Sequence, residues 1–250
     1  MADKRRAGRA RLATGLISLI ALIIAGPVLA QDISINFGDD TSLAARSIQL
    51  LLLVTVLSLV PGLAVMITCF PFIVTVLSIL RQAIGLQQSP PNMLIISLAL
   101  FLTWFVMDPV FTKAWTDGLM PLQNGAIDVQ AAIPLVLAPF RAFMAARLDP
   151  ETFAAMAELR VETAALAIPD APLSLLVPSF ILSEIQRAFE IGFVIFLPFL
   201  IIDLVVAAIL MSMGMMMVPP AVVSLPFKLA FFVVADGWSL IASALVRSYV

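Results

Sequence analysis

Few side chains in this sequence can take part in catalysis or bind a metal. No histidine occurs among the 250 residues, which removes the commonest general base and metal ligand. The one cysteine, Cys69, cannot form an intrachain disulfide or a thiolate metal site. The sequence therefore predicts a protein that is not an enzyme and that binds no cofactor or metal.

Two ionisable residues stand alone in long apolar stretches. Asp203 lies within residues 191–213, and Lys228 lies within residues 222–234. Inserting a charge at the centre of a membrane helix costs roughly 2.5–3.5 kcal/mol, so both side chains must face protein or water. For Asp203, a structural ion pair or buried hydrogen bond is favoured over a proton-sensitive site.

A second group of charges lies just before the apolar stretch of residues 191–213. Glu184, Arg187 and Glu190 are spaced three residues apart, which places them on one face of a helix. They can form a solvated face with weak intrahelical ion pairs, each worth a few tenths of a kcal/mol. They can equally form a polar contact between subunits or part of a channel wall, and the spacing leaves both alternatives open.

Methionine is concentrated in one turn between two apolar stretches. Five of the twelve methionines fall within seven positions: Met211, Met213, Met215, Met216 and Met217. The methionine side chain is unbranched and deformable, so a ring of such turns can close against itself and still adapt to a passing chain. The clustering favours this gasket over ordinary packing.

The composition indicates surroundings other than water for much of the chain. The sequence is 62% hydrophobic and 12% charged, whereas soluble domains are about 45–50% apolar and 25% charged. The excess of apolar residues must face lipid or other subunits. This excludes a cytosolic globular enzyme.

The first thirty residues have the three-part pattern of a secretory signal peptide. Five basic residues in the first eleven positions precede an apolar stretch, which ends in small residues at Ala30. We expect cleavage between Ala30 and Gln31, and the alternative is an uncleaved anchor. The mature chain of residues 31–250 would carry a net charge of −6 and no basic patch for nucleic acid. Its N-terminus would lie outside the inner membrane.

The mature chain is expected to form one domain of apolar helices. They cover about residues 43–85, with a break or kink at Pro61-Gly62, 93–108, 178–213 and 221–247, with a turn over 214–220. Residues 111–177 carry four basic and seven acidic residues and six prolines, which predicts short helices and loops outside the membrane. The fold class is an all-α membrane protein of helical hairpins with broken transmembrane helices.

Within residues 111–177, one helix start is signalled directly. Asp149-Pro150-Glu151 reads as an N-cap, a first-turn proline and a first-turn acid. We therefore expect a helix to begin at Pro150.

Long blocks of the sequence resemble one family. Residues 178–220 read PSFILSEIQRAFEIGFVIFLPFLIIDLVVAAILMSMGMMMVPP, and the block continues to Trp238. Residues 76–92 read VLSILRQAIGLQQSPPN, and residues 98–111 read LALFLTWFVMDPVF. These blocks closely resemble the FliP (FliP/SctR) family of type III secretion export-gate subunits.

This resemblance implies a helically staggered pentamer that joins FliQ and FliR subunits in an export gate, with FlhB and FlhA as further partners. The gate would pass unfolded flagellar rod, hook and filament proteins across the bacterial inner membrane, within the flagellar basal body. The resemblance gives Met215, Met216 and Met217 the role of the pore gasket.

The implied stagger also bears on the partner of Lys228. Glu184 of a neighbouring subunit would come level with Lys228, which makes that pair the preferred one. Asp203 is the second candidate, because Asp203 and Lys228 lie at similar depths from the turn at Gly214.

Two other functions compete with the flagellar gate. One is a gate subunit of a virulence injectisome, and the signal peptide favours the flagellar version over it. The other is a small-molecule secondary transporter, but the sequence has no internal repeat of the kind that is common in transporters.

Overall fold

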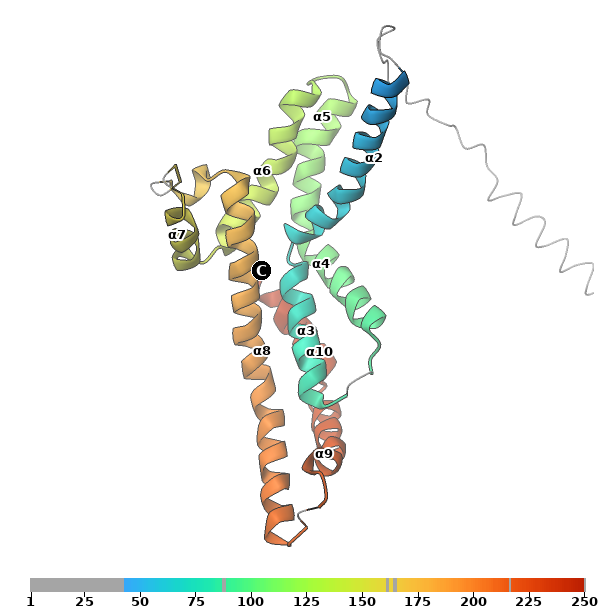
Figure 1. The fold of residues 1–250 in the computed structure, drawn as a ribbon, viewed down its shortest axis with the longest axis vertical. Helices are drawn as coiled ribbons and strands as arrows, with labels where there is room; N and C mark the ends of the chain where they lie inside the picture. Colours follow the sequence, from blue (N-terminus) through green and yellow to red (C-terminus); the bar gives the residue numbers. More distant parts are fainter. Residues whose placement is uncertain (1–42, 87–88, 161, 164–165, 216, 250) are drawn as a thin grey trace, which may run out of the picture. The chain divides into compact units, whose positions relative to one another are not determined.

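The computed structural model describes residues 43–86, 89–160, 162–163, 166–215 and 217–249, and these residues contain helices and no strand. The elements are α2 (Leu43–Met66), α3 (Phe70–Ile84), α4 (Asn92–Ala114), the π-helical turn η1 (Trp115–Leu119), α5 (Met120–Gln123), α6 (Val129–Arg147), α7 (Pro150–Glu158), the 3-10 turn η2 (Ile168–Asp170), α8 (Leu173–Ser212), α9 (Pro220–Val234) and α10 (Gly237–Arg247) (Figure 1). The chain divides into two units, residues 1–54 and 55–250. The first unit is described only over the first half of α2, and the packing of the other helices lies within the second unit. The expected signal peptide and its cleavage site at Ala30 and Gln31 lie outside the described residues.

The expected break at Pro61-Gly62 is wrong in position. Helix α2 continues through Pro61 to Met66, and α3 begins at Phe70 with a proline in its first turn. Proline is well tolerated in a first turn, where its missing N–H would have no partner in the helix. Between the two helices, the Thr68 hydroxyl donates to the Val65 carbonyl at 2.6 Å and accepts from the Phe70 amide at 3.2 Å. This hydroxyl stabilises the break between helices α2 and α3 at the observed position.

Helix α4 does not end at Asp108-Pro109, as the sequence suggested. It continues to Ala114 and passes directly into η1 and α5. Pro109 removes one backbone hydrogen bond, whereas the buried face of the helix continues on both sides of it through Met107 and Ala114. Packing along this face outweighs the one missing bond.

Residues 111–177 contain one long helix in place of only short ones. Helix α6 has 19 residues and passes through Pro134 and Pro139, and its N-cap is Asp128, whose carboxylate accepts from the Ala131 amide at 2.9 Å. In length and composition it is one of the candidate membrane spans. The expectation of short elements therefore fails for α6.

The short helix α7 begins where the sequence indicates. Asp149 is its N-cap and accepts from the Thr152 amide at 2.8 Å, and Pro150 stands in the first turn. The hydrogen bonds from the Thr152 amide and hydroxyl, with a smaller contribution from the Arg187 charge, lower the pKa of Asp149. Because this pKa is lower when the chain is folded, the cap stabilises the fold above the ordinary pKa of aspartate and loses this effect as the pH falls.

Helices α8 and α9 form the expected hairpin, but the second apolar stretch is bent. Helix α8 runs for 40 residues through Pro178 and Pro198. The chain turns after Ser212, and α9 begins at Pro220. The axes of α9 and α10 differ by 61°. The bend lies at Asp236, which adopts a left-handed conformation with φ of 48°. A Cβ atom on Gly237 would lie 2.7 Å from Phe232 Cζ, so only glycine permits this close approach across the bend.

The main core surrounds α3. This helix packs against α8, α4 and α9 (Figure 1). Its side chains and that of the preceding Cys69 include seven that are at most 1% exposed: Cys69, Phe72, Ile73, Val76, Leu77, Leu80 and Ala83. A second core lies between α6, α7 and α8 and includes Met144, Phe153, Leu176 and Phe180.

Four described helices are long and apolar enough to span a membrane, and the bent pair α9–α10 makes up to five. Helix α6 belongs to this set, which the sequence did not anticipate. Helix α3 has only 15 residues and falls short of the roughly 20 that a span requires.

Gly118 provides a test of the contact between η1 and α6. A Cβ atom at this position would lie 2.8 Å from the backbone nitrogen of Val136, which cannot move without displacing α6. We expect Gly118→Ala to lower the free energy of unfolding by about 1–3 kcal/mol through overpacking, measured by thermal or denaturant unfolding of the detergent-solubilised chain.

The matched control is Gly62→Ala, because a Cβ atom at Gly62 meets nothing within 4 Å. Alanine is the better helix former by roughly 1 kcal/mol, so this variant should be as stable as the parent or slightly more stable. Equal stability of the two alanine variants would contradict the close packing of η1 on α6.

Candidate functional site

The methionine turn, residues 211–217, begins in the last residues of α8 and has a defined backbone geometry around Gly214. Gly214 adopts φ of 75°, the Met215 amide donates to the Leu210 carbonyl at 2.9 Å, and the Gly214 amide donates to the Met211 carbonyl at 3.1 Å. This pair of bonds is a Schellman motif, in which a left-handed glycine ends the helix and satisfies its last carbonyls. The turn is therefore fixed at its start by Gly214.

The methionine side chains of this turn point outward in the subunit. Met217 is 97% exposed, and Met211, Met213 and Met215 are 41–66% exposed. Met216 lies outside the described residues. The turn therefore presents a cluster of flexible apolar side chains that the subunit itself does not cover.

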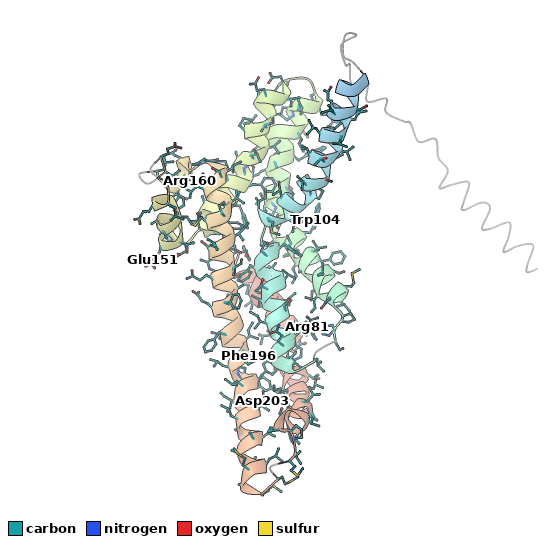
Figure 2. The ribbon with its side chains drawn as sticks, in the orientation of Figure 1. Arg81, Trp104, Glu151, Arg160, Phe196 and Asp203 are labelled. Carbon is teal, nitrogen blue, oxygen red and sulfur yellow. The ribbon has the colours of Figure 1, made fainter. Side chains whose placement is uncertain are left out.

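A charged cluster lies between α3, α8 and α9. The Lys228 Nζ atom lies 2.6 Å from Asp203 Oδ2 and donates to the Ala83 carbonyl at 3.1 Å, and the Ser224 hydroxyl donates to Asp203 Oδ1 at 2.6 Å. Figure 2 shows Asp203 on the stretch of α8 that lies beside α9. The Lys228 side chain is 7% exposed and that of Asp203 is 34% exposed. Both ends of the ion pair thus have further hydrogen-bond partners, as a buried charge requires.

The contact with Ala83 places the Lys228 ammonium at the end of α3. Ala83 belongs to the last turn of that helix, where carbonyls have no partner within the helix. A cation is favoured there by the helix dipole as well as by the hydrogen bond. Lys228 therefore joins the C-terminal end of α3 to the α8–α9 hairpin.

The preferred partner of Lys228, Glu184 of a neighbouring subunit, is not the partner that Lys228 has within the subunit. The Glu184 side chain is fully buried, with Arg147 Nε 3.2 Å from its Oε1 and the Tyr249 hydroxyl donating to its Oε2. Glu184 precedes Asp203 by 19 residues, about 28 Å along α8, whereas Asp203 lies level with Lys228 across the hairpin. The second candidate, Asp203, is the observed partner.

The other two charges of the predicted face do not join Glu184. Glu190 is exposed and accepts from the Gln186 amide group one turn away at 3.2 Å. Arg187 is half-buried, and its charge acts on Asp149. The three residues thus have separate surroundings, and whether Arg187 and Glu190 meet another subunit stays a prediction.

Sequence reasoning missed Arg147 and Tyr249, the two residues that bind Glu184. Arg147 stands at the end of α6 and Tyr249 comes after α10, so both are far from Glu184 in the sequence. No local spacing connects them. The one available signal was that Tyr249 is the single tyrosine of the chain.

Cys69 is a buried thiol. Its Sγ atom lies 4.0 Å from the Thr103 carbonyl oxygen, and burial raises the pKa of the thiol to about 12. It therefore stays protonated at neutral pH and is a poor nucleophile. Among the described residues, no group of three or more Cys, Asp or Glu side chains is arranged to hold a metal ion.

Comparison with known proteins identifies the family of this chain. The family model described as "FliP family" matches residues 53–245. The chain belongs to the FliP family. It is 46% identical over 242 residues to the flagellar biosynthetic protein FliP of Caulobacter vibrioides, with 96% of this chain and 91% of the relative covered. The proteins of the same name from Agrobacterium fabrum and Bacillus subtilis are 46% and 43% identical over 92% and 87% of this chain, and 97% and 98% of the relatives are covered.

A charge-swap experiment tests the partner of Lys228 in this FliP-family chain. We expect Lys228→Asp to destabilise the fold by about 3–5 kcal/mol, because two carboxylates would face each other at the end of α3. Adding Asp203→Lys should recover at least half of the loss, as measured by unfolding of the purified chain. Adding Glu184→Lys should recover nothing, since it also removes the partner of Arg147. Recovery by Glu184→Lys alone would contradict the pairing within the hairpin.

Proposed function

We propose that this chain is a core subunit of the flagellar type III protein export gate, through which unfolded rod, hook and filament proteins cross the inner membrane. The observation that carries this proposal is the match to the FliP family over residues 53–245, together with relatives from Caulobacter vibrioides and Bacillus subtilis that are named flagellar biosynthetic protein FliP. These names favour the flagellar gate over a virulence injectisome.

The proposed partners are those expected from membership of the family. The chain would form a pentamer, assemble with FliQ and FliR, and contact FlhB and FlhA during export. The exposed apolar side chains of α8 and α9 support assembly, because they include Phe193, Val194, Leu204 and Val234 at 61–88% exposure, which require lipid or protein around them.

The proposed location is the inner membrane within the flagellar basal body, with the mature N-terminus on the periplasmic side. Four to five described helices that are apolar enough to span a membrane support the membrane location. The basic, apolar and small-residue order of residues 1–30 supports export of the mature N-terminus.

In this proposal the methionine turns of neighbouring subunits close the pore. Each subunit would contribute Met215, Met216 and Met217, with Met211 and Met213 behind them. Thioether side chains bind no ion or water strongly and change rotamer at low cost, so their ring can block ions and still yield to an unfolded chain. The fixed Schellman geometry at Gly214 supports this mechanism, because it orients the turn while leaving the side chains free.

Genetic complementation and native mass measurement test the proposed function together. Deleting the gene should abolish motility and secretion of hook protein, and the full-length chain should restore both. Native mass measurement of the purified membrane complex should give five copies of this chain with FliQ and FliR. Normal hook secretion in the deletion strain, or a chain that purifies without these partners, would contradict the proposal.

The gasket has a separate test. We expect replacement of Met215, Met216 and Met217 by alanine to increase leakage of ions or small molecules across the inner membrane, because alanine leaves the ring open. The complex should still assemble, since the side chains of the exposed turn contribute little to the core of the subunit. The matched control is Met120→Ala, a methionine that is 44% exposed and lies outside the turn. Unchanged leakage through assembled gates would contradict the gasket and indicate that these methionines only pack against their neighbours.

A further inference from the structure

Two residues beyond the end of α10, Ser248 and Tyr249, reach into the middle of the subunit. The Tyr249 ring meets Phe72 of α3 edge-on with centroids 5.5 Å apart, and it stacks on Phe143 of α6 at 6.0 Å. Its hydroxyl donates to Glu184 Oε2 on α8. One side chain thus contacts three helices.

Arg147 binds the same segment from the other side. Its guanidinium carbon lies 4.0 Å from the centroid of the Tyr249 ring, a cation–π contact, and its Nη1 donates to the Ser248 carbonyl at 2.8 Å. Its Nε atom donates to Glu184, the acid that Tyr249 also binds. Most of the polar contacts of Arg147 therefore involve Ser248, Tyr249 or Glu184. Its Nη2 atom is buried without a partner in the described residues.

Helix α10 has few buried side chains of its own, although Ile241 packs against the main core and Trp238 meets Phe232 edge-on with centroids 5.4 Å apart. Gly237 and Leu245 are its two buried residues, it contacts α4 and α9, and Leu240 is 60% exposed. The 61° bend at Asp236 separates it from the axis of α9. The contacts of Ser248 and Tyr249 therefore add anchoring to α3, α6 and α8 that the helix itself provides only weakly.

We propose that Ser248 and Tyr249 form a latch that closes over the buried Arg147–Glu184 ion pair and holds α10 against α3, α6 and α8. Tyr249 is a positioning residue in this latch: its hydroxyl satisfies the Glu184 oxygen that Arg147 leaves free, and its ring covers the guanidinium. When the latch opens, Glu184 keeps one partner and Arg147 loses the Ser248 carbonyl, so opening weakens the ion pair that joins α6 to α8. The latch does not depend on the proposed export function, because it is a property of the folded subunit.

The single tyrosine allows the closed latch to be observed directly. Burial and the Glu184 carboxylate raise the pKa of the Tyr249 phenol above its ordinary value, with Arg147 opposing and Cys69 adding a small effect. Tyrosinate absorbance of the purified full-length chain in detergent reports this residue alone. We expect no tyrosinate in the folded chain when the pH passes about 10, where a free phenol ionises, and full ionisation once the chain is unfolded. Ordinary titration near pH 10 in the folded chain would overturn the proposal.

Trypsin cleavage after Arg247 measures how often the latch opens. Cleavage detaches Ser248 and Tyr249 from α10, and its rate is proportional to the open population when closing is fast. Tyr249→Phe keeps the ring and loses only the bond to a charged group, so cleavage should accelerate roughly tenfold to a hundredfold. Tyr249→Ala, which also loses the ring contacts, should be cleaved faster still.

The matched control is Ser243→Ala on the exposed side of α10, where the Ser243 hydroxyl bonds only to the Leu240 carbonyl one turn back. It should be cleaved at the parental rate. Equal cleavage of the parent and Tyr249→Phe would show that the hydroxyl does not close the latch and would overturn the proposal. Failure of the chain to complement motility, with these rates as expected, would count against the export function and leave the latch standing.

Discussion

Helix α3 is too short to cross a bilayer, and yet it is the helix around which the others pack. Six of its side chains between Phe72 and Ala83 are at most 1% exposed, because α4, α8 and α9 cover this face of the helix. A buried helix has to satisfy its terminal backbone groups within the protein. In its last turn the Ala83 carbonyl accepts a hydrogen bond from Lys228, and in its first turn the Phe72 ring packs edge-on against the Tyr249 ring. The burial of this helix therefore determines where the charged residues of α6, α8 and α9 must lie.

The two ion pairs found among the described residues of the second unit join α8 to different helices at different points along its length. Glu184 forms an ion pair with Arg147 of α6. About 28 Å further along α8, Asp203 forms an ion pair with Lys228 of α9. An ion pair in an apolar interior stabilises a fold only weakly, but loss of one partner is strongly unfavourable. Such pairs act mainly to exclude other arrangements. A shift of α9 along α8 by one turn would leave Lys228 and Asp203 unpaired. The ion pair therefore fixes the position of the methionine turn along the α8 axis relative to α3.

Features with local signals could be predicted from the sequence. The hairpin turn is signalled by Gly214 and the prolines after it, and the start of α7 by Asp149 and Pro150, since these residues act on the backbone next to them. The prolines inside helices were misleading. At Pro109 the local loss of a hydrogen bond is offset by packing of the rest of α4, which a local pattern does not contain, whereas α2 continues through Pro61 although its side chains are exposed.

The partners of the buried charges could be predicted only in part. Similar distances from the turn identified Asp203 as a candidate for Lys228, because the two helices of a hairpin can be compared by counting residues from the turn. Arg147, Glu184 and Tyr249 come from α6, α8 and the segment after α10, and only the tertiary fold brings them together. The bend at Asp236 belongs to the same class, since it depends on the approach of Phe232 to Gly237.

Hydrogen exchange tests the central role of α3 most directly. In the purified full-length chain, the amides of α3 should exchange more slowly than those of α7, and Lys228→Met should accelerate exchange selectively in the last turn of α3, around Ala83. The account predicts little change near Phe72 in that variant. Exchange in α3 as fast as in α7, or a last turn that is indifferent to Lys228→Met, would contradict it.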